Sequence, residues 1–81
     1  MITEVTSVDE FRNFLSLARC GDTCIYHSGN LTYDMRTNLI LKAVVAEVRE
    51  ACANETIILA QRRVADFLYE YRATCVVEAD L

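Results

Sequence analysis

The stretch F-L-Y-E-Y-R-A-T-C-V, residues 67 to 76, has the strongest secondary-structure pattern in the chain. Its odd-numbered residues are aromatic or apolar as far as position 75, and the residues between them are mostly polar or charged. This period of two predicts a β-strand with one face toward the core. The face predicted to be buried consists of Phe67, Tyr69, Tyr71, Ala73 and Cys75.

A second β-rich run, residues 56 to 63, precedes this strand. The segment Val64-Ala65-Asp66 separates the two runs and has a length suited to a hairpin loop. The sequence therefore predicts a C-terminal β-hairpin.

Residues 8 to 19 are predicted to form the first helix. Ser7 and Glu10 have the spacing of a capping box, in which each side chain accepts from a free backbone N–H at the helix start. Phe11 and Phe14 follow at the spacing of one helical face. Gly21 is expected to end this helix in the left-handed conformation.

A short strand is predicted at residues 23 to 27, between turn signals that include both glycines of the chain. Strand alternation places Cys24 and Tyr26 on one side and Thr23, Ile25 and His27 on the other. We interpret this region as a structural turn and strand, in preference to a catalytic or metal-binding loop.

Residues 32 to 53 contain neither glycine nor proline and are predicted to form one long helix, with Asn54 as its left-handed cap. Leu39, Ile40 and Ala43 widen its apolar sector beyond a single stripe. We therefore expect this helix to be covered on two sides, either by the sheet and first helix of its own chain or by a second copy of the protein.

These elements predict a single α+β domain over residues 1–81. The order is αβαββ, with two helices packed on a small antiparallel sheet that includes strand 23 to 27 and the hairpin. This order resembles a winged-helix arrangement in which the usual second and third helices have merged into one.

Composition limits the classes of function. The chain has 81 residues, 53% of them hydrophobic, and a net charge of −4, which disfavours long-range attraction to nucleic acid. Seven of its eight cationic residues are arginine, which makes forked contacts with carboxylates and phosphates. No apolar run approaches the roughly 20 residues of a membrane span, and no secretory signal is visible. We expect a cytoplasmic protein without membrane contact, and a homodimer, because a chain of this size is marginally stable alone.

A metal site is one chemical alternative. Cys20, Cys24 and His27 read as C-x3-C-x2-H, and Cys52 or Cys75 would supply a fourth zinc ligand. However, the predicted strand alternation separates these groups, so we expect buried free thiols, no metal and no cofactor. Catalysis is not expected either, because the single histidine has no evident orienting group.

The pair Arg62-Arg63 is the candidate binding feature, since it lies beside the predicted hairpin tip. Together with Arg36 and Asp66 it is expected to contact a protein partner or nucleic acid. The structural alternative is ion pairing of the two hairpin arginines with Asp66 and Glu70 across the hairpin.

Several short motifs resemble those of small proteins encoded in phages and prophages. They are Gly21-Asp22, Tyr26-His27-Ser28-Gly29-Asn30-Leu31, and Leu59-Ala60-Gln61-Arg62-Arg63 followed by the aromatic strand. The resemblance implies an accessory product of a mobile element, such as an inhibitor of a host enzyme or of a defence system, as anti-CRISPR proteins are.

The leading expectation is therefore a non-enzymatic protein that binds another protein. The alternatives are a winged-helix-like DNA-binding regulator that uses Arg62, Arg63 and Arg36 with Lys42 or Arg49, and a zinc-stabilised module.

Overall fold

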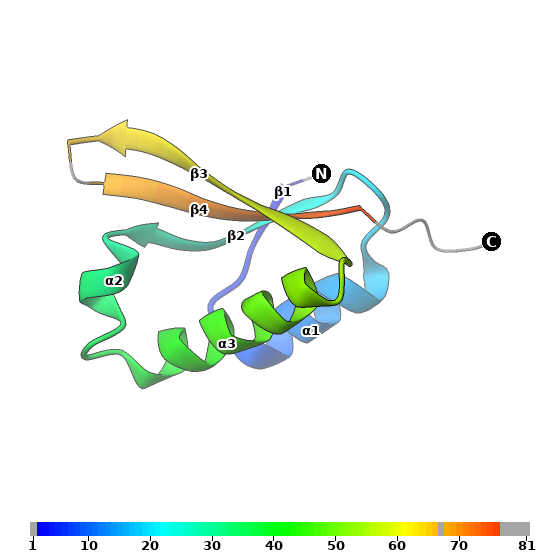
Figure 1. The fold of residues 1–81 in the computed structure, drawn as a ribbon, viewed down its shortest axis with the longest axis horizontal. Coiled ribbons are helices and arrows are strands. Elements are labelled where there is room, and N and C mark those ends of the chain that lie inside the picture. Colours follow the sequence, from blue (N-terminus) through cyan, green and yellow to red (C-terminus); the bar gives the residue numbers. More distant parts are fainter. Residues whose placement is uncertain (1, 67, 77–81) are drawn as a thin grey trace.

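A computed structural model describes residues 2–66 and 68–76, which form a four-stranded sheet with helices on one of its faces (Figure 1). In chain order the elements are β1 (Ile2–Glu4), α1 (Val8–Leu17), β2 (Thr23–Gly29), α2 (Leu31–Asp34), α3 (Leu39–Ala53), β3 (Ile57–Ala65) and β4 (Leu68–Cys75). The predicted α+β class and C-terminal hairpin are confirmed.

The strands lie in the order β1-β2-β4-β3. β2 pairs with β4, and β4 with β3, both antiparallel as predicted. β1 is an additional strand that runs parallel to β2, so the prediction of a purely antiparallel sheet is wrong. β1 has three exposed residues, too few to show a period of two, and its pairing depends on backbone groups that the sequence pattern does not reveal.

The buried face of β4 agrees with the alternation. Ala73 and Cys75 are buried, Tyr69 and Tyr71 are half-buried, and Phe67 lies outside the described residues. The hairpin is tighter than predicted, because β3 continues to Ala65, which pairs with Leu68.

Helix α1 begins as predicted and ends early. The Ser7 side chain accepts from the Glu10 N–H at 3.2 Å, but the Glu10 carboxylate accepts from the backbone and hydroxyl of Thr6, both at 2.7 Å. These bonds hold the pKa of Glu10 below its usual value. The helix stops at Leu17, and Gly21, with φ of 97°, lies in the following turn and does not cap it.

The predicted helix over residues 32 to 53 is two helices. Asn30 caps α2 by accepting from the Tyr33 N–H at 3.1 Å, and Asn38 caps α3 by accepting from the Leu41 N–H at 3.0 Å. Asparagine is favoured at such positions because its side chain satisfies an N–H that the first turn leaves free. The second and third helices are therefore separate, and the predicted merger is wrong.

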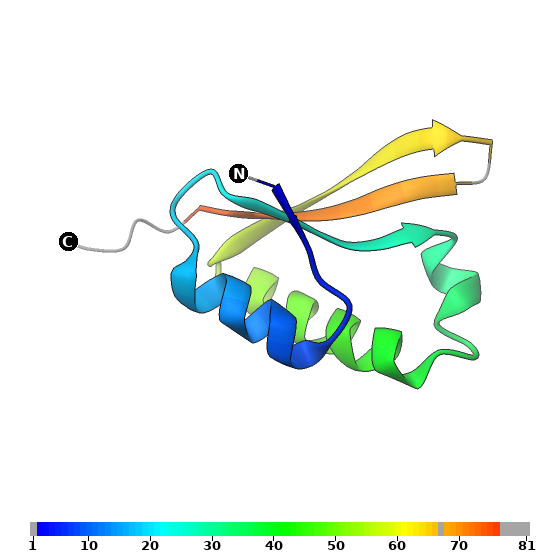
Figure 2. The same ribbon diagram turned by 180° about the vertical axis from the view of Figure 1, so that it is seen from behind.

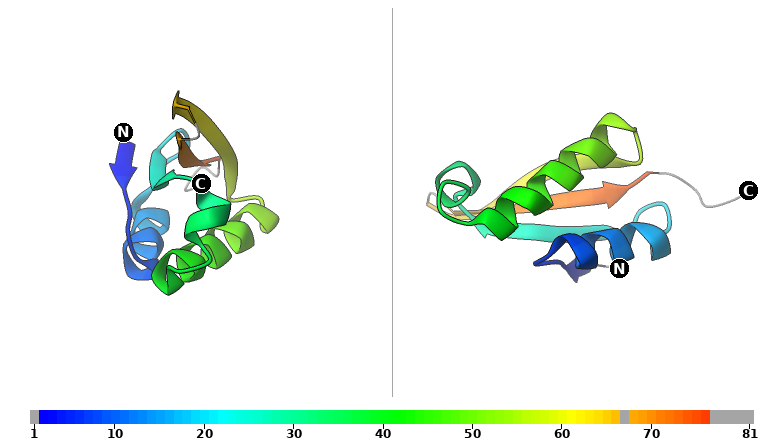
Figure 3. Two further views of the ribbon diagram at one scale, coloured as in Figure 1. Left: turned by 90° about the vertical axis from the view of Figure 1, so that its left-hand side faces the viewer. Right: turned by 90° about the horizontal axis from the view of Figure 1, so that it is seen from below.

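The core lies between the sheet and helices α1 and α3, which run side by side beneath it (Figure 3). Helix α3 contributes five buried side chains, Leu41, Val44, Val45, Val48 and Ala51. An ion pair between Arg12 and Glu47 joins the two helices at their surface. Helix α3 is covered by the sheet and by α1 of its own chain, which is the first of the two expected alternatives. Leu39, Ile40 and Ala43 are exposed, and a second copy over them stays a prediction.

The turn after α3 does not use Asn54 in the left-handed conformation. Asn54 has φ of −82°, and the next residue, Glu55, has φ of 62°. A residue with a Cβ atom is strained there, whereas glycine is not.

Glu55→Gly is therefore expected to raise the free energy of unfolding by about 0.5–1 kcal/mol, as measured by urea denaturation. The matched control is Asn54→Gly, which places glycine where φ is already negative and is expected to lower stability by a similar amount. A loss of stability in Glu55→Gly would contradict the argument.

No helix in the described ranges is long and apolar enough to cross a membrane.

Candidate functional site

The cysteines do not form a common site. Cys24 and Cys75 are buried, Cys52 is half-buried and Cys20 is exposed, and no disulfide joins two of them within the described ranges. Within residues 2–66 and 68–76, no three side chains of histidine, cysteine, aspartate or glutamate converge as metal ligands. The C-x3-C-x2-H spacing therefore has no zinc-binding geometry in this part of the chain.

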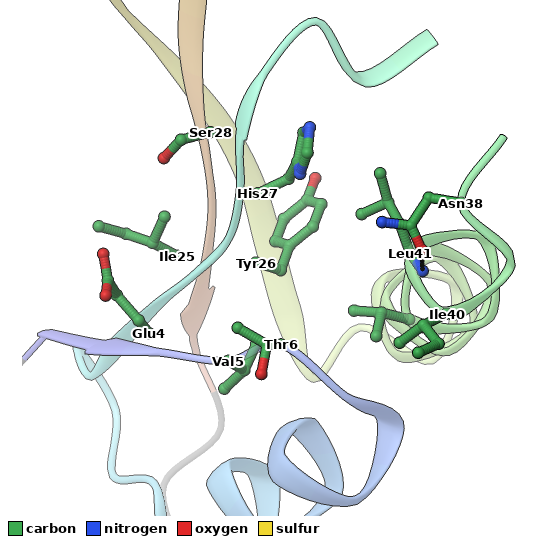
Figure 4. Close-up of a pocket in the computed structure, with 11 residues that line it drawn as sticks. Glu4, Val5, Thr6, Ile25, Tyr26, His27, Ser28, Asn38, Ile40 and Leu41 are labelled. Atoms are coloured by element: carbon green, nitrogen blue, oxygen red, sulfur yellow. Dashed lines mark hydrogen bonds between the residues drawn. The ribbon is translucent and has the colours of Figure 1, made fainter. Parts of the chain in front are cut away.

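His27 lies on a different face from the one predicted. A bulge in β2 between Ile25 and His27 leaves Tyr26 without a partner on β4, and His27 pairs with Tyr71. Consequently Tyr26 and His27 both point toward the helices, while Ile25 and Ser28 point away (Figure 4). The His27 and Tyr71 rings stack with their centroids 6.2 Å apart.

His27 also links β2 to the end of α2. Its Nε2 atom lies 2.7 Å from Oδ2 of Asp34. Gly29, with φ of 134°, allows this approach, because a Cβ atom there would lie 2.9 Å from the same carboxylate oxygen. Tyr71 contacts the start of α2, where its hydroxyl oxygen accepts from the Leu31 N–H at 3.4 Å.

A cleft of about 250 Å³ adjoins His27 and is lined on its helical side by Asn38, Ile40 and Leu41 (Figure 4). The contact between His27 and Asp34 connects β2 to the end of α2, and Asp34 is an orienting group for the histidine that the sequence did not reveal.

Burial sets the chemistry of Cys24. The side chain has no exposed surface, and desolvation raises the pKa of its thiol to about 11. The Cys24 thiol is therefore protonated at neutral pH and is a poor nucleophile within the core.

The raised pKa predicts weaker stability at alkaline pH. In the unfolded chain the thiol loses its proton near pH 8.5, whereas in the folded protein it keeps the proton to about pH 11. Below about pH 8.5 the Cys24 thiol is protonated in both states, so pH does not change the stability through it. As pH rises from there to about 11, the free energy of unfolding falls by about 1–3 kcal/mol, because only the unfolded chain releases the proton.

Urea unfolding at several pH values between 8 and 11, under reducing conditions, measures this effect. The Cys24→Ala variant is expected to show a shallower decline, with a remainder from Tyr26, whose pKa burial also raises. Equal declines in the two proteins would contradict the assignment.

Three of the four predicted binding residues lie together near the hairpin tip. Arg63 forms an ion pair with Asp66, as the structural alternative predicted. Arg62 lies opposite Glu70 in the register, but the Glu70 carboxylate accepts from Arg72, at 2.8 and 3.3 Å. Arg62 is exposed, and because Glu70 pairs with Arg72, Arg62 has no ion pair with any described residue.

Arg36 is not part of this group. It is exposed in the turn between α2 and α3, which Figure 1 shows on the helical side of the sheet, at the same end of the molecule as the hairpin tip. No hydrogen bond or ion pair joins the Arg36 side chain to the described residues of the hairpin.

β3 forms an outer edge of the sheet. Of its nine residues only Ile57 is buried. Ile58 is 57% exposed, Leu59 41% and Val64 49%, so the strand presents apolar side chains to solvent. β4 is the only described strand that pairs with it, which leaves its outer backbone groups without a partner strand.

An apolar groove of about 390 Å³ runs beside β3. It arises because β3 starts next to the end of α3 and diverges from it toward the hairpin tip (Figure 2). Its lining consists of Tyr26, Leu31, Val45, Val48, Leu59, Ala60 and Tyr71, with Arg49 and Gln61 as polar members. Groove and strand are continuous, since residues 59 to 61 belong to both. We call the two together the β3 edge.

The sequence pattern does not reveal the β3 edge. Strand β3 is visible as a β-rich run, but its place at the outside of the sheet follows from strand order. The groove joins residues from β2, α2, α3, β3 and β4, and no spacing along the chain connects them.

Comparison of the chain with protein-family models, curated proteins and solved structures finds no match.

Proposed function

We propose that this protein acts by binding another protein at the β3 edge, without catalysing a reaction. The observation that carries the proposal is the nine-residue edge strand with eight exposed residues beside an apolar groove. Long exposed edges with apolar side chains pair readily with other chains. A protein that retains such an edge has a surface suited to a partner.

The unpaired Arg62 supports the same surface. Strand alternation places Arg62 on the face of the sheet opposite the groove, because Leu59 pairs with the buried Ala73 and Arg62 pairs with Glu70. A partner that extends along β3 can reach this guanidinium group with a carboxylate, which gives orientation and selectivity. Arg62 is available to a partner because it is exposed and because the neighbouring Glu70 accepts its hydrogen bond from Arg72 instead.

DNA binding has less support. The net charge is −4, and the exposed side of α3 carries Glu50 as well as Lys42 and Arg49. Helix α2 has four residues, and no hydrogen bond or ion pair joins Arg36 to the described residues of the hairpin. A DNA-binding surface needs several cations aligned along the phosphate backbone.

The resemblance to small phage and prophage proteins provides the biological setting for the proposal. A product that inhibits a host enzyme or a defence system stoichiometrically needs a binding surface and no catalytic centre. We therefore propose an accessory protein of this type, which acts in the cytoplasm of the host cell.

Affinity capture from a host-cell lysate, read by quantitative mass spectrometry, tests the proposal. The bait proteins are the native chain, Arg62→Glu, and the control Arg19→Glu, which changes an exposed arginine at the opposite end of the sheet. A partner should be retained by the native chain and the control, and reduced at least about tenfold by Arg62→Glu. Equal capture by all three baits would place binding elsewhere and contradict the proposal.

Titration with duplex DNA at increasing salt tests the alternative. We expect no binding at low salt. Affinity that falls steeply with salt concentration, and that Arg62→Glu weakens, would favour the DNA-binding regulator.

A further inference from the structure

The backbone of β3 is suited to an extended ligand. In an antiparallel pair, alternate residues direct their N–H and C=O groups toward the neighbouring strand, and the others direct theirs outward. The pairing of β3 with β4 is regular from Ile57 to Arg63 and shifts only between Arg63 and Ala65. This regular segment contains no proline, and its charged side chains, Arg62 and Arg63, lie only at its end.

The groove determines which side chains such a ligand would carry. In a strand added to β3, every second side chain lies on the face of the sheet that the helices cover. On that face Leu59 and Gln61 border the groove, and behind them lie Val45, Val48 and Tyr71. Alternate positions of the ligand would therefore be apolar, as in other cases of recognition by strand addition.

Charge adds a preference for acidic groups on both faces of the added strand. Arg49 lines the groove on the helical face, whereas Arg62 alternates with the inward Leu59 and Gln61 and lies on the opposite face. Neither has an ion pair with a described residue. Arg63 adds a third guanidinium group, which Asp66 partly neutralises. A second copy of this chain paired along β3 would bring two such sets of arginines together, so the charges favour a different and acidic occupant.

We infer that the β3 edge binds an extended acidic segment of a partner protein, which adds to the sheet as a fifth strand beside β3. Its apolar side chains enter the groove, where a carboxylate at the groove rim meets Arg49, and its carboxylates on the opposite face of the sheet meet Arg62. This inference rests on the proposed function and specifies the mode of binding.

Selection from a displayed library of random dodecapeptides tests the inference, with the native chain as the target. The enriched sequences are expected to alternate apolar with acidic residues. A synthetic peptide of the enriched sequence should bind at least about tenfold more weakly to Arg49→Glu and to Arg62→Glu, and with unchanged affinity to Arg19→Glu. Circular dichroism of each variant confirms that it is folded.

Backbone N-methylation distinguishes strand addition from other modes. Methylating one alternate series of amides in the synthetic peptide should abolish binding, and methylating the other series should not, because only one series faces β3. Equal tolerance of both series, or enriched sequences without acidic residues, would overturn the inference.

The remaining outcomes separate the inference from the proposed function. If no peptide is enriched but Arg62→Glu still fails to capture a protein that the native chain captures, the strand-addition inference is contradicted and the proposed protein binding is supported. If no peptide is enriched and Arg62→Glu captures the same proteins as the native chain, both are contradicted. Light scattering that shows a dimer of the native chain, which Leu59→Glu dissociates, would identify a second copy as the occupant and overturn the inference.

Discussion

Replacing Phe11 with alanine is expected to lower the free energy of unfolding by about 3–5 kcal/mol. The Phe11 side chain is fully buried, and its ring stacks on Phe14 with the centroids 6.4 Å apart. Truncation removes the transfer free energy of the ring and leaves a cavity that α1, α3 and the sheet close only in part. A loss of this size is a large fraction of the stability of a domain of 81 residues.

Urea denaturation followed by circular dichroism measures the effect. The matched control is Leu17→Ala in the same helix, where the side chain is 73% exposed and the change should stay within about 0.5 kcal/mol. A loss below about 1 kcal/mol for Phe11→Ala would mean that α1 does not pack on the core as described.

Replacing Gly29 with alanine is expected to cost about 2–3 kcal/mol. Two causes act together at this position. The backbone has φ of 134°, which residues with side chains rarely adopt. In addition, the new Cβ atom would lie 2.9 Å from Oδ2 of Asp34 and 3.3 Å from Nε2 of His27, so the hydrogen bond between these groups would have to open.

The control for this prediction is Gly21→Ala. Gly21 has φ of 97°, but no atom lies within 4 Å of the position its Cβ would take, so only the backbone strain remains. Gly29→Ala should therefore be the more destabilising of the two in urea unfolding. The chemical shifts of the His27 ring in an NMR spectrum should change in Gly29→Ala and not in Gly21→Ala. Equal losses of stability in the two variants, with an unchanged His27 signal, would contradict the role of Gly29 in leaving room for the hydrogen bond between His27 and Asp34.

The candidate site was partly predictable. The adjacent cations Arg62 and Arg63 and the hairpin are visible in the sequence, because both are local patterns. The sequence does not show which arginine lacks an ion pair. That depends on whether the Glu70 carboxylate pairs with Arg62 across the strands or with Arg72 on its own strand. Arg49 joins the site only because β3 diverges from α3 and leaves a groove that reaches it.

Short-range chemistry determined much of this protein: the cap at Ser7, the buried phenylalanines of α1, the hairpin and the inward face of β4. These follow from side-chain spacing and from hydrogen bonds within a few residues. Tertiary structure alone decided the parallel pairing of β1, the bulge that turns His27 toward Asp34, and the outer position of β3. Each of these depends on backbone groups meeting across the sheet, and a linear pattern of side chains does not record which strands become neighbours.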